Sequence, residues 1–226
     1  MLQQTQVSRA IPRFESFMSH WPTIASLAAA TNPEVLAQWS GLGYNTRALR
    51  LRDAAMAIAE SGWPTTPRDL QKLPGVGTYT ANAIASMSFG AHVAATDTNL
   101  RRVLSRWFGA ALNGVDLVEY ADEVVGEPAG TWNQAVMDLG AEICTPKAPS
   151  CGRCPVSDSC ADPTVYVPPV RQSKFDGSNR QLRGALVRAS LAGDNLSDAG
   201  RSLGRSDAEI RHTIAALAAE GLVPFD

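Results

Sequence analysis

The chain contains four cysteines, and all of them lie within one stretch of seventeen residues: Cys144, Cys151, Cys154 and Cys160. Their spacing, C-x6-C-x2-C-x5-C, is typical of four thiolates that share one four-coordinate site. Structural zinc sites usually pair two C-x2-C knuckles across a longer loop, whereas this stretch has a single such pair. The spacing therefore favours a [4Fe-4S] cluster over zinc. Two disulfides are disfavoured, because nothing else in the chain indicates secretion.

The bulk composition is that of a globular protein of one or two domains. The 226 residues are 45% hydrophobic and carry a formal net charge of −2. Nucleic-acid binders often carry an excess of basic residues, so this net charge by itself does not indicate one. Only three of the twenty cationic residues are lysines, and arginine is the better bidentate partner for phosphate. No apolar run approaches the length of a membrane span, and no export signal opens the chain. We therefore expect a cytoplasmic protein that is not associated with a membrane.

Apolar residues recur at helical spacing along most of the chain, which predicts an all-α fold. The predicted helices of the first part are 9–20, 33–39, 47–60, 81–89, 100–108 and 132–143. In the helix 47–60, one face is expected to carry Leu49, Leu51, Ala54, Ala55 and Ile58. The predicted domains are a helical core at 1–143, a cluster loop at 144–162, a linker at 163–178 and a small helical module at 179–226.

The C-terminal module is predicted to contain helices near 179–191, 196–203 and 206–220. Ser206 can N-cap the last helix, with Glu209 at the capping-box position. A turn at Gly204 and a short strand beginning at Leu222-Val223 would resemble a winged helix-turn-helix that stops before a wing forms. A plain three-helix packing module is the alternative.

Residues 73–81 read L-P-G-V-G-T-Y-T-A, which is the helix-hairpin-helix signature. Gly75 and Gly77 permit a tight turn in which no side chain separates the backbone from a ligand. Their amides, and the first turn of a helix that opens near Thr78 and includes Thr80, can bind one anion, for which a DNA phosphate is suitable. Val76 is expected to anchor this turn in the core.

The order of these motifs resembles the endonuclease III superfamily of DNA glycosylases. An aspartate follows the hairpin by about twenty residues and precedes the cysteine stretch. Three further segments, M-L-Q-Q-T-Q-V at 1–7, G-L-G-Y at 41–44 and N-Q-A-V-M-D-L-G at 133–140, look like motifs of A/G-specific adenine DNA glycosylases of the MutY type. The resemblance covers residues 1–162. It implies a helix-hairpin-helix glycosylase fold with a [4Fe-4S] cluster, a monomeric nucleoid-associated protein, and double-stranded DNA with an adenine mismatch as the partner.

The resemblance implies hydrolysis of the bond between a flipped-out base and its deoxyribose. Asp97 is then the carboxylate that stabilises the oxocarbenium-like sugar, and it can also N-cap a helix beginning near Asn99. Asn99 resembles a residue that helps to orient this carboxylate. Tyr79 stands where relatives that also cut the backbone carry a Schiff-base lysine, so the enzyme is expected to have no lyase step.

Five other positions take roles from the resemblance. Gln4 and Tyr44 resemble the side chains that wedge into the duplex beside the flipped base, and Leu2 and Gln134 resemble parts of the adenine pocket. Lys147 lies in a loop that touches DNA phosphate in relatives. Without the family pattern, Tyr44 reads equally well as a turn aromatic, and Gln134 as a surface residue of a helix.

The sequence departs from the family pattern at its beginning. Relatives read S-E-x-M-L-Q-Q-T, and that glutamate is their general acid, whereas this sequence begins at Met1 and Glu15 lies outside the motif. A start set too far downstream is the favoured explanation. We expect residues 1–226 alone to release base very weakly or not at all, and an added upstream S-E segment to restore activity.

The sequence also departs from the pattern at its end. MutY-type enzymes usually carry a Nudix-like β domain that recognises 8-oxoguanine, and residues 166–226 are too short and too helical for it. Because this tail carries Arg171, Lys174, Arg180, Arg183 and Arg188, we expect it to add non-specific DNA affinity. Its deletion would then flatten the salt dependence of binding.

Two other functions stay open on the sequence. A thymine–guanine mismatch glycosylase would share the hairpin, the aspartate and the cluster, although the Q-Q-T-Q-V and N-Q-A segments argue against it. A DNA-binding protein without catalysis would use the cluster as a scaffold and the tail as an anchor.

Overall fold

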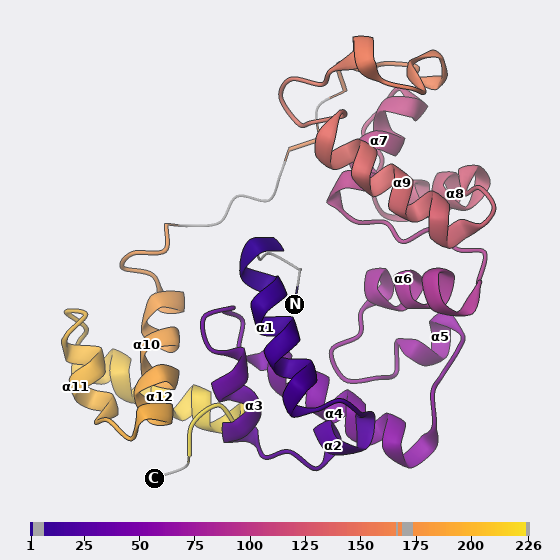
Figure 1. Ribbon diagram of the computed structural model, residues 1–226. Helices are drawn as coiled ribbons and strands as arrows, with labels where there is room; N and C mark the ends of the chain where they lie inside the picture. The colour runs from indigo at the N-terminus through magenta and orange to yellow at the C-terminus, as the bar shows by residue number, and fades with distance from the viewer. Residues whose placement is uncertain (2–6, 166, 169–173, 225–226) are drawn as a thin grey trace. The chain divides into compact units, whose positions relative to one another are not determined.

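The computed structural model describes residues 1, 7–165, 167–168 and 174–224, and every regular element in this part of the chain is a helix (Figure 1). The predicted all-α class is therefore confirmed. Leu2 and Gln4, and Arg171 of the tail, lie outside the described residues. None of the described helices is long and apolar enough to cross a membrane.

Packing divides the chain into two compact units that do not follow the linear order of the sequence. Residues 1–63 and 172–226 form the first unit, and residues 64–171 form the second. The predicted boundaries at 143, 162 and 178 stay a prediction about how the chain is organised along its length.

The first unit begins with four helices whose ends are fixed by local capping. They are α1 (Val7–His20), α2 (Ile24–Ala28), α3 (Asn32–Trp39) and α4 (Thr46–Ser61). Thr23 and Thr31 each form a capping box at the start of a helix, and Pro33 stands in the first turn of α3, where its missing N–H costs nothing. The prediction that Leu51 shares the buried face of α4 was wrong, because Leu51 is 40% exposed, while Leu49 is buried.

The three C-terminal helices complete the core of this unit. They are α10 (Asn179–Ala192), α11 (Leu196–Arg201) and α12 (Asp207–Ala219), and the predicted capping box of Ser206 and Glu209 is present. One buried cluster joins residues from both ends of the chain: Phe17, Trp39, Leu49, Leu182, Leu186, Ile210, Leu217 and Leu222. Glu220 also accepts hydrogen bonds from Thr46, at 3.1 Å, and from Arg183, at 2.6 Å. The tail is thus an integral part of the first unit.

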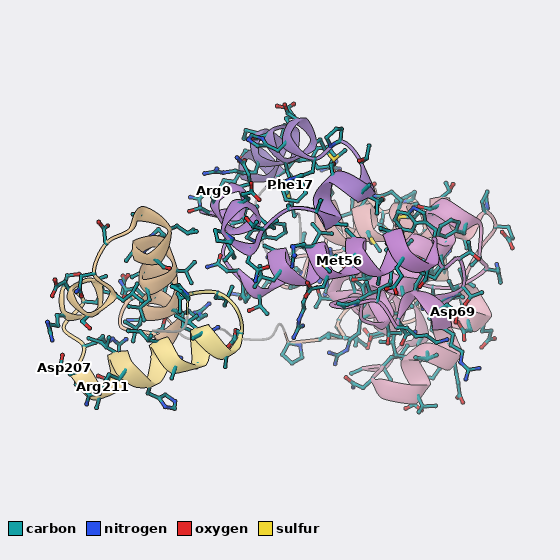
Figure 2. All side chains as sticks on the ribbon, turned by 90° about the horizontal axis from the view of Figure 1, so that it is seen from below. Arg9, Phe17, Met56, Asp69, Asp207 and Arg211 are labelled. Carbon is teal, nitrogen blue, oxygen red and sulfur yellow. The ribbon has the colours of Figure 1, made fainter. Side chains whose placement is uncertain are left out.

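The prediction of a short strand beginning at Leu222-Val223 was wrong. Gly221 adopts a left-handed φ of 71° after α12, and this turn directs Leu222 and Val223 into the core, where both are buried. No strand occurs anywhere in the described residues, so the module is a three-helix packing unit. The charged residues of α12 remain at the surface, and Figure 2 shows Asp207 and Arg211 on this helix.

Truncation of Leu217 tests whether the tail stabilises the N-terminal helices. Leu217 is fully buried, so Leu217→Ala should lower the free energy of unfolding by about 2–5 kcal/mol. The same change at the exposed Leu51 should cost about 0.5 kcal/mol or less. Chemical denaturation of the two variants makes the comparison, and equal losses would contradict the shared core.

The second unit consists of α5 (Pro67–Leu70), α6 (Thr78–Phe89), α7 (Thr98–Phe108), α8 (Gly114–Val124) and α9 (Ala129–Glu142), followed by the 3-10 turns η1 (Cys151–Arg153) and η2 (Ser157–Ser159). Glycines let α9 approach its neighbours closely. A Cβ on Gly140 would lie 2.8 Å from the Cβ of Asn99 on α7, and one on Gly130 would lie 2.8 Å from the carbonyl oxygen of Ser86 on α6. The start of α7 is therefore packed directly against the end of α9.

Candidate functional site

The hairpin between α5 and α6 has the geometry that its glycines predict. Gly75 adopts a left-handed φ of 76°, and the Val76 amide closes the turn onto the Leu73 carbonyl at 3.1 Å. Val76 packs against the cluster formed by Leu70 and its neighbours, so the predicted anchor is confirmed. Within the described residues, neither Gly75 nor Gly77 donates its amide to a backbone carbonyl.

The first turn of α6 adds further amides to this surface. Gly77 is the N-cap of α6 and has no side chain with which to bond those amides. The predicted helix start at Thr78 is confirmed. A helix N-terminus that lacks a side-chain cap carries unsatisfied N–H donors and a partial positive charge. The hairpin is thus suited to an anion.

Asp97 is the N-cap of α7, as the sequence predicts. One of its oxygens, Oδ1, accepts the Leu100 amide at 2.7 Å, which fixes the orientation of the carboxylate. In the described part of the chain, Oδ2 accepts no hydrogen bond, so this second oxygen is available to a ligand. The side chain is half-buried.

Tyr79 lies in the same neighbourhood as Asp97. Its hydroxyl is 4.0 Å from the Met137 sulfur, and its side chain is half-buried. Burial raises the pKa of the Tyr79 phenol, and the negative charge of Asp97 raises it further. Tyr79 therefore keeps a neutral hydroxyl at neutral pH, within reach of the charge of Asp97.

This arrangement predicts the titration of Tyr79. Because the folded state raises its pKa, the unfolded chain ionises first, so stability is lost as the pH rises above about 10 and not at lower pH. The difference in phenolate absorbance between the native chain and Tyr79→Phe isolates this group. Asp97→Asn should bring its pKa part of the way back, and a Tyr79 that titrates at or below the ordinary value would contradict the placement.

Asn133, which sequence reasoning missed, holds the segment that leads into Asp97. This amide is fully buried and donates to the Val93 carbonyl at 2.9 Å and to the Ser86 hydroxyl at 3.0 Å, while its oxygen accepts the Ala95 amide at 2.8 Å. Asn133 opens the N-Q-A segment, but nothing in its immediate sequence marked it as buried. The neighbouring Gln134 was chosen instead, and it is exposed, with its amide 3.4 Å from Asp138.

Asn99 and Arg102 connect the start of α7 to the end of α9. Arg102 is buried and donates to the Asn99 side-chain oxygen at 2.9 Å, to the Gly140 carbonyl at 2.5 Å and to the Cys144 carbonyl at 2.7 Å. Burial lowers the pKa of its guanidinium, and the nearby Cys144 and Asp97 oppose that change. The sequence identified Asn99 but not Arg102, whose partners are mostly backbone carbonyls.

The remaining predicted residues are separated between the two units. Lys147 is exposed in the loop that follows α9. Tyr44 belongs to the first unit, where it is 44% exposed with a left-handed φ of 50°, and the Arg47 guanidinium lies 5.1 Å from the centre of its ring. The DNA contact assigned to Tyr44 and the adenine-pocket role assigned to Gln134 stay predictions.

The four cysteines line a single cavity of about 90 Å³ in the second unit, and none forms a disulfide. Burial raises the pKa of the Cys160 thiol, as does proximity to Cys144, Cys151 and Cys154. In the described residues, no three His, Cys, Asp or Glu side chains are placed to hold a single metal ion. A [4Fe-4S] cluster takes one thiolate at each of its four irons, and the four cysteines that line this cavity supply that number.

Arg106, which the sequence did not identify, joins the two ends of the cysteine loop. It is 2% exposed, and its guanidinium donates to the Cys144 sulfur and the Thr145 carbonyl, both at 3.0 Å, and to the Val165 carbonyl at 3.2 Å. Its own carbonyl accepts the Asp162 amide at 3.0 Å. This buried cation can therefore compensate the negative charge of thiolate ligands.

Comparison with known proteins agrees with this geometry. Residues 1–125 match the model of the HhH-GPD superfamily of base excision DNA repair proteins, and residues 144–160 match the iron-sulfur binding domain of endonuclease III. The matched cysteine segment carries the [4Fe-4S] ligand set that the spacing predicts.

Curated relatives of this chain include adenine DNA glycosylases. That of Mycolicibacterium smegmatis is 40% identical over 83% of this chain and 68% of its own length. The human protein is 44% identical over 71% of this chain, which spans 31% of that relative.

Among solved structures, a thermostable thymine-DNA glycosylase matches 71% of this chain and 78% of its own chain with a TM-score of 0.65 and 28% identity. A non-covalent endonuclease III–DNA complex matches 71% of this chain and 78% of its own with a TM-score of 0.62 and 22% identity, which shows the shared fold. The chain belongs to the HhH-GPD superfamily of base excision DNA repair proteins and, within it, to the adenine DNA glycosylases.

Proposed function

We propose that this protein binds double-stranded DNA and hydrolyses the N-glycosidic bond of adenine mispaired with 8-oxoguanine or guanine. The observation that carries the proposal is the Asp97 carboxylate. It is oriented by its N-cap hydrogen bond, it has one oxygen that accepts no hydrogen bond from the described residues, and it lies near the neutral phenol of Tyr79. We further propose that the protein acts as a monomer.

The hairpin supports the DNA-binding part of the proposal. The exposed amides of Gly75 and Gly77, together with the uncapped start of α6, can bind a phosphate without reading sequence. A strand held in this way keeps its register while one nucleotide leaves the stack, which an enzyme acting on a base requires.

The chemical step then depends on electrostatics. As the bond to adenine breaks, adenine takes up a proton and leaves, and positive charge develops on the deoxyribose, where the fixed Asp97 carboxylate stabilises it. Water then adds to C1′ and releases a proton. Asn133 acts as a positioning residue, because it holds the backbone immediately before Asp97. Tyr79 cannot form a Schiff base, so the phosphodiester backbone is left intact.

The cysteine centre has a structural role in this mechanism. The residues that would hold a [4Fe-4S] cluster are Cys144, Cys151, Cys154 and Cys160, and when bound the cluster would cross-link the loop that carries Lys147. Hydrolysis transfers no electron, so base release requires nothing from this centre except the placement of that loop.

A single-turnover assay tests the proposed function. Duplexes with adenine opposite 8-oxoguanine, adenine opposite guanine and thymine opposite guanine are incubated with the protein, and the released base is measured. We expect adenine release, which is very weak for residues 1–226 alone and is restored by an added upstream S-E segment, and no thymine release, with strand breaks appearing only after alkali treatment. Preferential release of thymine would overturn the proposal in favour of the thymine–guanine activity.

A further inference from the structure

The loop between α3 and α4, residues 41–45, has a backbone conformation that is costly to hold. Tyr44 adopts a left-handed φ of 50°, and no other residue with a side chain does so in the part of the chain that the structure describes. Gly41 and Gly43 have φ values of 90° and 72°, which glycine adopts readily. A left-handed tyrosine is unfavourable by itself and persists only where its surroundings fix it. The contacts of this loop therefore indicate what holds Tyr44 in place.

The first half of the loop is held by buried side chains. The Trp39 indole N–H donates to the Gly43 carbonyl at 3.0 Å. Leu42 is buried and belongs to the same core cluster as Leu186 and Leu217 of the tail. This half of the loop is therefore fixed by the shared core of the first unit.

The second half of the loop leads into α4, and the tail supplies its polar contact. Asn45 is the N-cap of α4, but among the described residues its side chain makes no capping hydrogen bond. The next residue, Thr46, donates its hydroxyl to the Glu220 carboxylate at 3.1 Å. A carboxylate beside a helix N-terminus is also favoured by the partial positive charge of the first turn. Glu220 therefore holds the start of α4 from the tail.

Glu220 is itself held in position and kept ionised. The Arg183 guanidinium of α10 donates at 2.6 Å to Oε2 of Glu220, the same oxygen that accepts the Thr46 hydroxyl. The hydrogen bond from Arg183 holds the pKa of the Glu220 carboxyl below its ordinary value. The carbonyl of the next residue, Gly221, accepts the Asn32 side-chain amide at 3.3 Å. The end of α12 is therefore fixed against both α10 and α3.

We propose that Glu220 is a positioning residue, which acts from the C-terminal tail through Thr46 to hold Tyr44 in its left-handed conformation. The connection is short, because Tyr44 lies two residues before Thr46 and its carbonyl accepts the Arg47 amide at 2.9 Å. Contact between Tyr44 and DNA rests on the proposed function, whereas the support of the loop by the tail does not. The tail thus serves the enzyme through the loop that it supports.

The sign of the effect on DNA binding separates this proposal from simple electrostatics. Removal of an acidic side chain that pairs with an arginine should strengthen the binding of a polyanion or leave it unchanged. If Glu220 positions Tyr44, Glu220→Ala should instead weaken binding. Asp198→Ala is the matched control, because Asp198 also pairs with an arginine of the tail, Arg201, at 3.1 Å. Fluorescence anisotropy gives the dissociation constant of each full-length variant for an adenine-mismatch duplex, and thermal unfolding checks that each variant is folded.

A double-mutant cycle tests whether Glu220 acts through Tyr44. We expect Glu220→Ala to weaken binding about fivefold in the native background and less than about twofold in the Tyr44→Ala background, while Asp198→Ala weakens it in neither. Thr46→Val, which removes the hydroxyl and keeps the shape of the side chain, should reproduce the effect of Glu220→Ala. Glu220→Gln keeps an acceptor for Thr46 and should retain part of the native affinity.

Hydrogen exchange of the DNA-free chain tests the support of the loop independently of function. The amides of residues 42–48 should exchange about fivefold faster in Glu220→Ala than in the native chain, and at the native rate in Asp198→Ala. Unchanged exchange in Glu220→Ala, or additive losses of affinity in the cycle, would overturn the inference even if the protein binds DNA and releases adenine. A native chain that does not bind the duplex would defeat the proposed function, and the exchange result would then decide this inference alone.

Discussion

Asp97→Asn is expected to slow adenine release about 10³-fold in single-turnover assays of the chain extended by the upstream S-E segment, which corresponds to about 4 kcal/mol of transition-state stabilisation. Asparagine is as good an N-cap as aspartate, so it keeps the hydrogen bond to the Leu100 amide and the start of α7. The substitution therefore removes the negative charge while preserving the local structure. Any loss of rate then reports the electrostatic contribution of the carboxylate.

The matched control for this variant is Asp116→Asn. Asp116 lies in the first turn of α8 in the same unit and is exposed, so the same chemical change should leave the rate within about twofold. DNA affinity and thermal stability should be close to those of the native chain in both variants. Equal rates for Asp97→Asn and Asp116→Asn would exclude Asp97 as the stabilising carboxylate.

Arg106→Met should lower the iron content of the protein and destabilise the second unit by about 3–5 kcal/mol. Methionine can fill the volume of the arginine stem but leaves the Cys144 sulfur and the carbonyls of Thr145 and Val165 without their donor. These acceptors lie at opposite ends of the cysteine loop, so each end loses a side-chain attachment to α7 and keeps the bonds from the Asp162 amide to the carbonyl of residue 106 and from Arg102 to the Cys144 carbonyl.

Iron and sulfide content per chain, together with denaturant unfolding, measure both effects. Arg153→Met is the control, because Arg153 lies in the same loop between two cysteines but is exposed. It should retain the iron content and the stability of the native chain. If Arg106→Met also retains them, the arginine is not what holds the loop.

The features that the sequence predicted correctly depend on residues that are close to one another along the chain. The N-cap of Asp97, the capping box of Ser206 and the hairpin turn at Gly75 each depend on residues within four positions of one another. The cysteine spacing likewise predicted a shared cavity, because the four side chains belong to one loop. Local patterns of this kind determine their geometry before tertiary packing is considered.

The features that the sequence did not reveal depend on partners far along the chain. Asn133 bonds to residues 38–47 positions away, and the guanidinium of Arg106 bonds to groups 38–59 positions away. Most of these partners are backbone atoms, and because every residue type has the same backbone groups, the sequence does not indicate which of them will be bonded. The helix α8 was missed for a different reason. Leu117, Tyr120, Ala121 and Val124 face the core at helical spacing, but the exposed valines at 115 and 118 obscure this period in the sequence.

The placement of the tail was also beyond sequence reasoning. Leu182 and Leu217 fit a helical period within a separate module just as well as they fit the core of the N-terminal helices. Periodicity shows that a helix has an apolar face but not which helix covers it. The contact between Glu220 and Thr46 is a consequence of that packing, so it could not be inferred before the structure was known.

The most direct test of the account is the binding of a charged sugar mimic. One duplex carries a cationic pyrrolidine in place of the target deoxyribose, and the other carries a neutral tetrahydrofuran; neither has a base to release, so the measurement does not depend on protonation of a leaving group. Because a transition-state mimic binds through the groups that stabilise the transition state, the native chain should prefer the cationic duplex about 100-fold, and Asp97→Asn should lose that preference. Equal affinity of the native chain for the two duplexes, or the same preference in the variant, would show that Asp97 does not face the sugar.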